Sequence, residues 1–292
     1  MKTKVIRTIL IALTLFFWLD VAGQGYKYVE ASKLTLCGKI LMNTANPYHR
    51  VDTASYKGFT AGENAQVRMS SGYGKVIWPD NTNGFSARGY DLYIRKDEKW
   101  LYAGSGTNDP KNPARGLKIV TDMGEGDKEC LLYLPLYSEV NSVKIGVVTD
   151  SYIEPLENPF RYRIAVFGSS YTQGSCTTRS GMTYLAQLGR STGLEFLSLG
   201  CGGNCRLQSY FADVLCDSEA DAFEVERGAM ADKMMAVALK KYKDVYFIEP
   251  DATSSNHDAT VDGVHPDNYG YTLWAESIRQ PILEILGRYD IK

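Results

Sequence analysis

The chain has 292 residues, a formal net charge of −2 at neutral pH and an isoelectric point of about 6.0. This balance excludes the strongly basic composition with which proteins bind nucleic acid or an anionic membrane surface, so we expect neither partner. The length is sufficient for two modest domains, each with an apolar core.

The N-terminus predicts a secretory signal peptide over residues 1–23. Basic residues come first, an apolar run follows at Ile9–Leu19, and Val21-Ala22-Gly23 resembles a small-residue cleavage site. The apolar run is too short for stable insertion as a membrane-spanning helix. We therefore predict cleavage between Gly23 and Gln24 and export to the periplasm or the extracellular space, with an uncleaved anchor as the alternative.

The next region, from Lys33 to Thr149, has the pattern of short β-strands. Apolar and polar residues alternate around Tyr90-Asp91-Leu92-Tyr93-Ile94, and turn residues such as Asn83-Gly84 and Lys96-Asp97-Glu98-Lys99 separate the runs. Strands at this spacing predict a β-sandwich domain over residues 24–153, followed by a Pro-containing linker at residues 154–159.

Residues 160–292 predict alternating strands and helices. Strands are expected at residues 163–167, 194–199 and 245–248, and helices at residues 183–190, 229–242 and 271–286. Alternating βα units form a parallel sheet, and ligands bind outside the carboxyl ends of its strands.

The chain has six cysteines, at positions 37, 130, 176, 201, 205 and 216. Export permits disulfides, but their pairing cannot be read from a sequence. Cys201 and Cys205 together with Cys176 also suggest a metal site. No histidine is near them in the sequence, and a closed zinc site needs four ligands. We therefore expect free thiols or a disulfide, and no metal.

Two segments carry candidate catalytic groups. An apolar run ends in Gly168-Ser169-Ser170 before a helix-like segment, which places a serine hydroxyl at the carboxyl end of a strand. In Asp262-Gly263-Val264-His265-Pro266, a carboxylate stands three residues before a histidine. A serine hydroxyl needs a base, imidazole can take its proton and return it, and a carboxylate orients the imidazole. We predict Ser170 as nucleophile, His265 as base and Asp262 as orienting acid.

Each segment alone has a simpler interpretation. Gly-Ser-Ser is typical of a turn, Asp262-Gly263 is typical of a hairpin, and a histidine in a loop is usually a surface residue. The occurrence of both segments, in this order and each in its expected local setting, favours a hydrolytic triad.

These segments resemble three blocks of the SGNH (GDSL) hydrolases. The first block resembles Gly168-Ser169-Ser170-Tyr171-Thr172-Gln173-Gly174, with Ser169 where many members have aspartate. The second resembles Ser198-Leu199-Gly200-Cys201-Gly202-Gly203-Asn204, and the last resembles Asp262-Gly263-Val264-His265-Pro266. Upstream, Arg88-Gly89-Tyr90-Asp91-Leu92-Tyr93 resembles the signature of the GxDLY domain, a β-rich module that precedes some bacterial SGNH esterases.

The resemblance implies a three-layer, flavodoxin-like α/β hydrolase domain behind the β-sandwich. It implies a serine esterase that needs no cofactor and that binds the oxyanion with the backbone N–H groups of Ser170 and Gly203. The expected substrate is a small-molecule or polysaccharide ester. Because a β module accompanies the hydrolase, an acyl group such as acetyl on a carbohydrate is the preferred substrate.

One block of the family has no counterpart in its expected place. The family carries an oxyanion-binding asparagine after a central strand, whereas here Ala220-Asp221-Ala222-Phe223 runs into Glu224-Val225-Glu226. Charges at this density do not fit a strand buried on both faces. The stretch from Gly203 to Asp262 is also short for two crossovers, since a βαβ unit takes about 30 residues or more. We therefore predict a shortened hydrolase domain without this block.

Three asparagines in separate segments could be mistaken for the absent block, and none is expected to replace it. Gly106-Thr107-Asn108-Asp109 matches it by letter, but it precedes the nucleophile and is predicted to be a loop. Asn204 belongs to the second block and Asn256 follows no strand. The alternative function is therefore a catalytically impaired SGNH homologue that binds carbohydrate or another partner. Metal-dependent deacetylation would need a His/Asp cluster that the sequence does not reveal.

Overall fold

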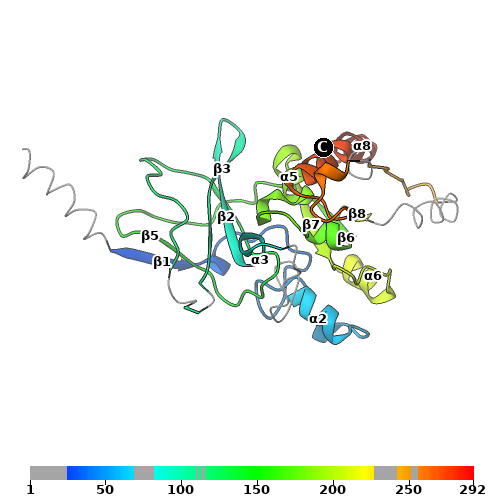
Figure 1. Ribbon diagram of the computed structural model, residues 1–292, viewed down its shortest axis with the longest axis horizontal. Helices are drawn as coiled ribbons and strands as arrows, with labels where there is room; N and C mark the ends of the chain where they lie inside the picture. Colours follow the sequence, from blue (N-terminus) through cyan, green and yellow to red (C-terminus); the bar gives the residue numbers. More distant parts are fainter. Residues whose placement is uncertain (1–24, 69–81, 110, 113–115, 227–241, 251–255) are drawn as a thin grey trace, which may run out of the picture. The chain divides into compact units, whose positions relative to one another are not determined.

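The computed structural model describes residues 25–68, 82–109, 111–112, 116–226, 242–250 and 256–292 (Figure 1). The predicted signal peptide and nearly all of the predicted helix 229–242 lie outside the described residues. Among the residues that are described, no helix is both long and apolar enough to cross a membrane.

Internal contacts divide the chain into two units. The smaller unit comprises the chain up to Thr35 together with Ser142–Glu157, and the larger one comprises Leu36–Asn141 and Asn158–Lys292. The domain boundaries predicted from the sequence, at residues 153 and 160, stay a prediction.

The smaller unit contains a two-stranded antiparallel sheet. Strand β1 (Tyr26–Glu30) pairs with β5 (Lys144–Val148), and the short 3-10 helix η1 (Ala31–Lys33) follows β1. The Glu30 carboxylate accepts hydrogen bonds from the backbone N–H of Val143 at 2.9 Å and from the hydroxyl of Ser142 at 2.6 Å, which ties the entry of β5 to the end of β1.

The larger unit contains a three-stranded antiparallel sheet in the order β3-β2-β4. Its strands are β2 (Gly89–Lys96), β3 (Lys99–Thr107) and β4 (Cys130–Tyr133). The turn predicted at Lys96–Lys99 joins β2 to β3, and its two central residues, Asp97 and Glu98, have φ values of 49° and 62°. Such left-handed residues are typical of tight hairpins, since they match the twist of the strands.

Two predictions in this region need correction. Asn83-Gly84, predicted as a turn between strands, instead begins a helix: the Asn83 side chain accepts two backbone N–H groups and caps α3 (Gly84–Arg88), a common role of asparagine. The loop predicted at Gly106-Thr107-Asn108-Asp109 is found only for Asn108 and Asp109, because Gly106 and Thr107 lie in β3 and pair with Tyr90 and Gly89 of β2.

The larger unit also contains a parallel sheet in the order β7-β6-β8. Its strands are β6 (Arg161–Gly168), β7 (Leu194–Gly200) and β8 (Ala222–Val225). Helices α5 (Tyr184–Thr192) and α8 (Asn268–Gly287) lie on one side of this sheet, and α2 (Ala61–Arg68) and α6 (Ser209–Cys216) lie on the other (Figure 1). The predicted mixed α/β architecture is confirmed.

Alternation along β6 explains these three layers. Ile164 and Val166 pack with α5 and α8, whereas Ala165 and Phe167 pack with Val67 of α2 and with residues of α6. Both faces of the strand are therefore buried, as expected for a central parallel strand. Short elements complete the fold: η2 (Thr53–Ser55), α4 (Ser170–Gln173), η3 (Ser180–Met182) and η4 (His257–Ala259).

Two strand predictions near the C-terminal half need correction. Glu224 and Val225 do continue a strand. Among the described residues β8 pairs with β6 on one side and with no further strand, so Glu224 is only partly buried and Val225 is exposed. The predicted strand 245–248 is wrong. Its backbone forms no regular structure, Val245 and Phe247 are exposed, and Ile248 alone packs against the core.

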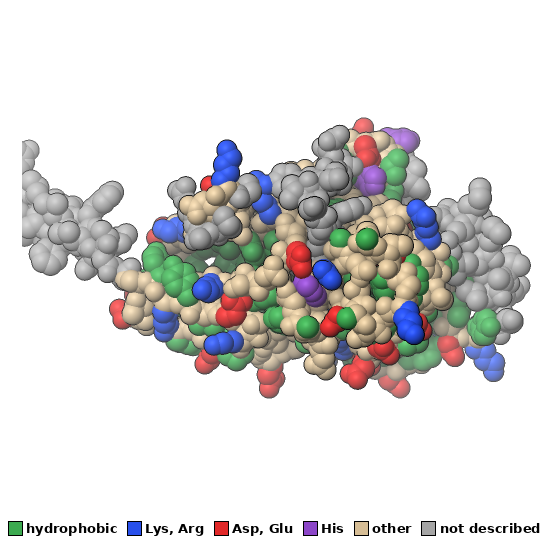
Figure 2. Space-filling view, turned by 90° about the horizontal axis from the view of Figure 1, so that it is seen from below, with side chains coloured by type: hydrophobic (Ala, Val, Ile, Leu, Met, Phe, Trp, Pro, Cys, Tyr) green, Lys and Arg blue, Asp and Glu red, His purple; other side chains and the backbone are tan. Residues whose placement is uncertain are grey.

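Charges of both signs are interspersed over the face shown in Figure 2. This distribution accompanies a formal net charge of only −2.

Candidate active site

Ser170 is the first residue of α4, directly after the central strand. Strand β6 ends at Gly168, and the Ser169 hydroxyl caps the helix by accepting the N–H of Tyr171 at 3.3 Å. A side chain at Gly168 would overlap Thr172 and the Glu226 carboxylate, so the turn requires glycine. The turn thus presents the Ser170 hydroxyl at the carboxyl edge of the sheet, where ligands bind in this architecture.

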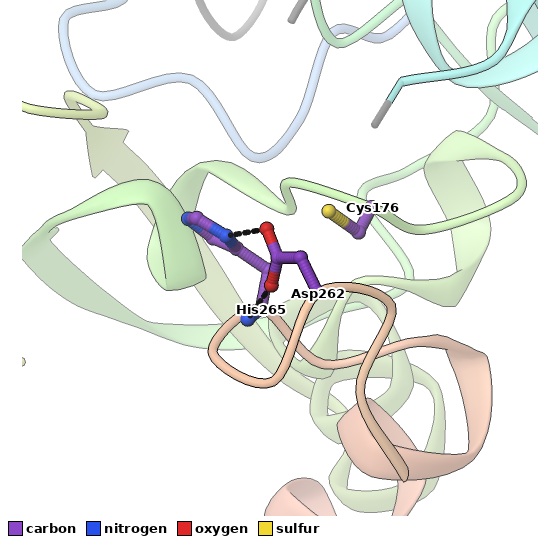
Figure 3. Close-up of side chains that lie close together, drawn as sticks. All are labelled: Cys176, Asp262 and His265. Atoms are coloured by element: carbon purple, nitrogen blue, oxygen red, sulfur yellow. Dashed lines mark hydrogen bonds and ion pairs between the residues drawn. The ribbon is translucent and has the colours of Figure 1, made fainter. Parts of the chain in front are cut away.

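The structure brings the three predicted triad residues together. Oγ of Ser170 lies 3.0 Å from Nε2 of His265, and Nδ1 of His265 lies 2.7 Å from Oδ2 of Asp262. Figure 3 shows the Asp262 carboxylate against the imidazole. With the proton on Nδ1, the imidazole donates to Asp262 and its Nε2 accepts the serine hydroxyl proton, which is the arrangement a base-activated serine requires.

The loop that carries His265 is fixed by its own hydrogen bonds. Oδ1 of Asp262 accepts the backbone N–H groups of Val264 at 3.0 Å and of His265 at 2.7 Å. The hydroxyl of Tyr171 donates to the carbonyl of Val264 at 2.5 Å. Because Tyr171 follows Ser170 directly, this bond joins the nucleophile turn to the histidine loop.

The second block is held against the nucleophile helix. The Gln173 side chain accepts the N–H of Gly202 at 2.7 Å, and the Gln66 amide of α2 donates to the carbonyl of Gly202 at 2.9 Å. A side chain at Gly200 would overlap the backbone of Gln173. These contacts fix the turn between β7 and α6 relative to α4.

The two predicted oxyanion donors lie at the same edge of the sheet. Gly168 and Gly200 are paired in the parallel register of β6 and β7, so Ser170 and Gly203 follow neighbouring strand ends. Gly203 is exposed, with a φ of 74°. Neither N–H donates to a protein acceptor within the described residues, so both are open to a developing oxyanion.

Known families and structures match the chain on both sides of the linker. Residues 79–153 match the model of the N-terminal GxDLY domain of SGNH-hydrolase-type esterases, and residues 161–227 match the GDSL-like lipase/acylhydrolase family. A crystal structure from Bacteroides ovatus ATCC 8483, classed as a GDSL-like lipase, is 30% identical, with a TM-score of 0.81 over 90% of this chain and 98% of that one. The chain belongs to the GDSL-like lipase family.

The fold of this chain is also similar to that of more distant proteins. The salicylyl-acyltransferase SsfX3 of a tetracycline biosynthetic pathway is 16% identical, with a TM-score of 0.64 over 91% of this chain and 99% of that one. At this identity the likeness shows the fold alone. No curated protein matches the sequence at a significant level.

A carboxylate follows β8, close to the place where the family carries its asparagine. One oxygen of Glu226, Oε2, accepts the backbone N–H and the hydroxyl of Ser169, both at 2.7 Å, and the hydroxyl of Thr172 at 3.2 Å. The N–H of Glu226 in turn donates to the carbonyl of Phe167 at 2.9 Å. Glu226, directly after β8, therefore holds the turn that carries Ser170 from the side opposite the second block.

Two of the three asparagines considered in the sequence hydrogen-bond to other side chains. The Asn204 amide donates to Oε1 of Gln66 at 2.8 Å, and Asn256 precedes η4 without a side-chain cap. Asn108 hydrogen-bonds to Tyr90 in the antiparallel sheet.

The GxDLY signature contains a buried acid, Asp91. Asp91 is only 1% exposed, and its Oδ2 accepts the N–H of Gly181 at 2.8 Å and the Arg179 guanidinium at 3.1 Å. Burial raises the pKa of Asp91, and Arg179 together with the Gly181 N–H opposes that rise. This acid ties β2 to the loop between α4 and α5.

The cysteines do not form the metal site considered from their spacing. Within the described residues, the group that brings together three metal-type ligands is Cys176, Asp262 and His265 (Figure 3). All six cysteines are free thiols in the structure. The sequence did not predict that Cys176 lies beside Asp262 and His265, because Cys176 and Asp262 are far apart along the chain.

Proposed function

We propose that this chain is an exported serine esterase that hydrolyses carboxylic esters through an acyl-serine intermediate. The observation that carries the proposal is the continuous hydrogen-bonded series from Ser170 through His265 to Asp262, at 3.0 and 2.7 Å. Membership of the GDSL-like lipase family supports the same reaction class.

In the acylation step, Oγ of Ser170 attacks the ester carbonyl carbon while Nε2 of His265 takes the hydroxyl proton. Asp262 stabilises the imidazolium and keeps its orientation. The N–H groups of Ser170 and Gly203 bind the carbonyl oxygen as it becomes negative. The bond to the alcohol then breaks, and His265 returns the proton to the leaving oxygen.

In the deacylation step, a water molecule takes the place of the alcohol. His265 removes its proton as it attacks the acyl carbon, and the bond to Ser170 breaks with return of that proton to Oγ. The products are the free carboxylic acid and the regenerated serine. No cofactor is required at any step.

The preferred substrate is a small acyl group, such as acetyl, carried by a saccharide. Support comes from the GxDLY domain at residues 79–153, a β module that accompanies the hydrolase. The proposed export would place the enzyme where polysaccharides are accessible.

Hydrolysis of p-nitrophenyl acetate by the purified protein tests the reaction class. Ser170→Ala should lower kcat by roughly 10⁴-fold or more while the protein stays folded, because the acyl intermediate cannot form. Ser55→Ala, at an exposed serine of η2, is the matched control. Undiminished turnover by Ser170→Ala would refute the triad assignment.

A substrate panel separates the finer alternatives. Acetylated xylo-oligosaccharide, p-nitrophenyl acetate and p-nitrophenyl palmitate should rank in that order of kcat/KM. A preference for the long acyl chain would contradict the saccharide proposal and leave the esterase mechanism intact.

A further inference from the structure

A thiol lies beside the proposed triad without taking part in it. Sγ of Cys176, a carboxylate oxygen of Asp262 and a ring nitrogen of His265 all lie within 4.8 Å of one another. Figure 3 shows that Cys176 comes from the segment after α4, whereas the other two come from the loop before α8. The three side chains therefore converge from two separate parts of the fold.

The position of Cys176 is fixed by the fold. Its side chain is 5% exposed, and its φ is 68°, a left-handed conformation that residues with a β-carbon rarely adopt. The preceding residue, Ser175, donates its N–H to the carbonyl of Ser170 at 2.9 Å and accepts the hydroxyl of Tyr271 at 2.8 Å. The thiol is thus held at the triad by contacts with both α4 and α8.

We propose that Cys176, Asp262 and His265 form a binding site for a thiophilic divalent cation such as Zn²⁺, and that the bound cation inhibits the esterase. A thiolate, a carboxylate and an imidazole are the three ligand types zinc takes in proteins, and water would complete a tetrahedral site. Zinc bonds of about 2.0–2.3 Å require donor atoms roughly 3–4 Å apart, so a small side-chain rotation closes the site.

The inhibition follows from the two nitrogens of the imidazole. Zn²⁺ on Nδ1 of His265 displaces the proton that this nitrogen shares with Asp262, and the neutral ring then carries its proton on Nε2. Nε2 can no longer accept the proton of Ser170. The proton of the Cys176 thiol is released to solvent as the Zn–S bond forms.

Direct binding is the first test, and it does not depend on the esterase proposal. Co²⁺ added to the full-length protein should give one equivalent of sulfur-to-cobalt charge-transfer absorption, which Zn²⁺ displaces. Cys176→Ser should abolish this absorption and weaken Zn²⁺ binding by more than about 10-fold, the lower range for losing even an outer-shell partner of a metal ligand. Cys216→Ser, at an exposed cysteine outside the site, should bind like the parent protein.

The inhibition itself rests on the proposed function. Zn²⁺ should inhibit p-nitrophenyl acetate hydrolysis by the parent protein and by Cys216→Ser, with inhibition of Cys176→Ser requiring more than about 10-fold more metal. Cys176→Ala serves the same purpose if the serine variant does not fold. Unaltered Zn²⁺ affinity in both Cys176 variants would overturn the proposal, as would binding of Co²⁺ without the charge-transfer band. A protein that binds the metal through Cys176 but hydrolyses no ester would refute the proposed function and retain the site.

Discussion

Removal of the Glu226 carboxylate should slow catalysis, although Glu226 acts through Ser169 and not by contact with the substrate. Glu226 accepts three hydrogen bonds on one oxygen, and two of them, from the N–H and hydroxyl of Ser169, are 2.7 Å long. Bonds of this length to a carboxylate are charge-assisted. Glu226→Ala leaves these donors without their acceptor and releases the residue that caps the nucleophile helix.

The expected magnitude follows from the number of bonds. A charge-assisted hydrogen bond contributes about 1.5–3 kcal/mol net, and the partial exposure of Glu226 reduces this, so Glu226→Ala should lower the free energy of unfolding by about 2–4 kcal/mol. A displacement of Ser170 by about 1 Å would lower kcat by roughly 10²-fold. KM should change little, since Glu226 acts through Ser169.

The assay is steady-state hydrolysis of p-nitrophenyl acetate, with urea unfolding measured on the same samples. Glu226→Gln keeps an acceptor oxygen in place and should retain activity within about 10-fold of the parent protein, because neutral hydrogen bonds are roughly half as strong. Glu276→Ala, at an exposed glutamate of α8, is the control. The reasoning fails if Glu226→Ala remains folded and turns over as fast as the parent protein.

Three further predictions concern stability and export. Burial, with the neighbouring Glu226 charge, raises the pKa of Glu224 to about 7. The folded state therefore binds more protons than the unfolded state between pH 4.5 and 7. The free energy of unfolding should fall as pH rises through that window. Urea unfolding of Glu224→Gln should lack this part of the slope, and parallel curves for the two proteins would contradict it. Asp91→Ala leaves the partly buried Arg179 unpaired and should cost about 3–5 kcal/mol in thermal or urea unfolding, against no change for the exposed Asp127→Ala. N-terminal sequencing of the protein from an expressing bacterium should begin at or near Gln24, and recovery of an intact Met1 in the cytoplasm would exclude export.

The sequence was most informative where short-range patterns determine structure. The apolar run before Gly168 predicted β6, and the helix predicted at residues 271–286 is most of α8. The spacing of Asp262 and His265 predicted that their side chains would meet, since a three-residue loop leaves them few other positions.

The sequence was least informative where a residue depends on its place within the sheet. Glu224 and Glu226 argued against a strand because the strand expected at this place would be buried on both faces. In the described structure β8 pairs with β6 on one side only and is not fully buried, and Glu226, the residue after it, reaches the turn that carries Ser170. The same limit applies to Asp91, whose partner Arg179 is distant in the sequence.

The segment from Leu36 to Arg68 also has a practical consequence for dissecting the protein. Ile40, Val51 and Val67 cover the face of the parallel sheet opposite α8, and Arg50 donates to the carbonyls of Ser198 and Gly200 at 3.1 and 3.0 Å. A fragment that starts at the linker would lose this cover and expose an apolar sheet surface to water. Such a fragment should aggregate during expression, so the hydrolase half is not a portable module that can be fused to another protein without its upstream partner.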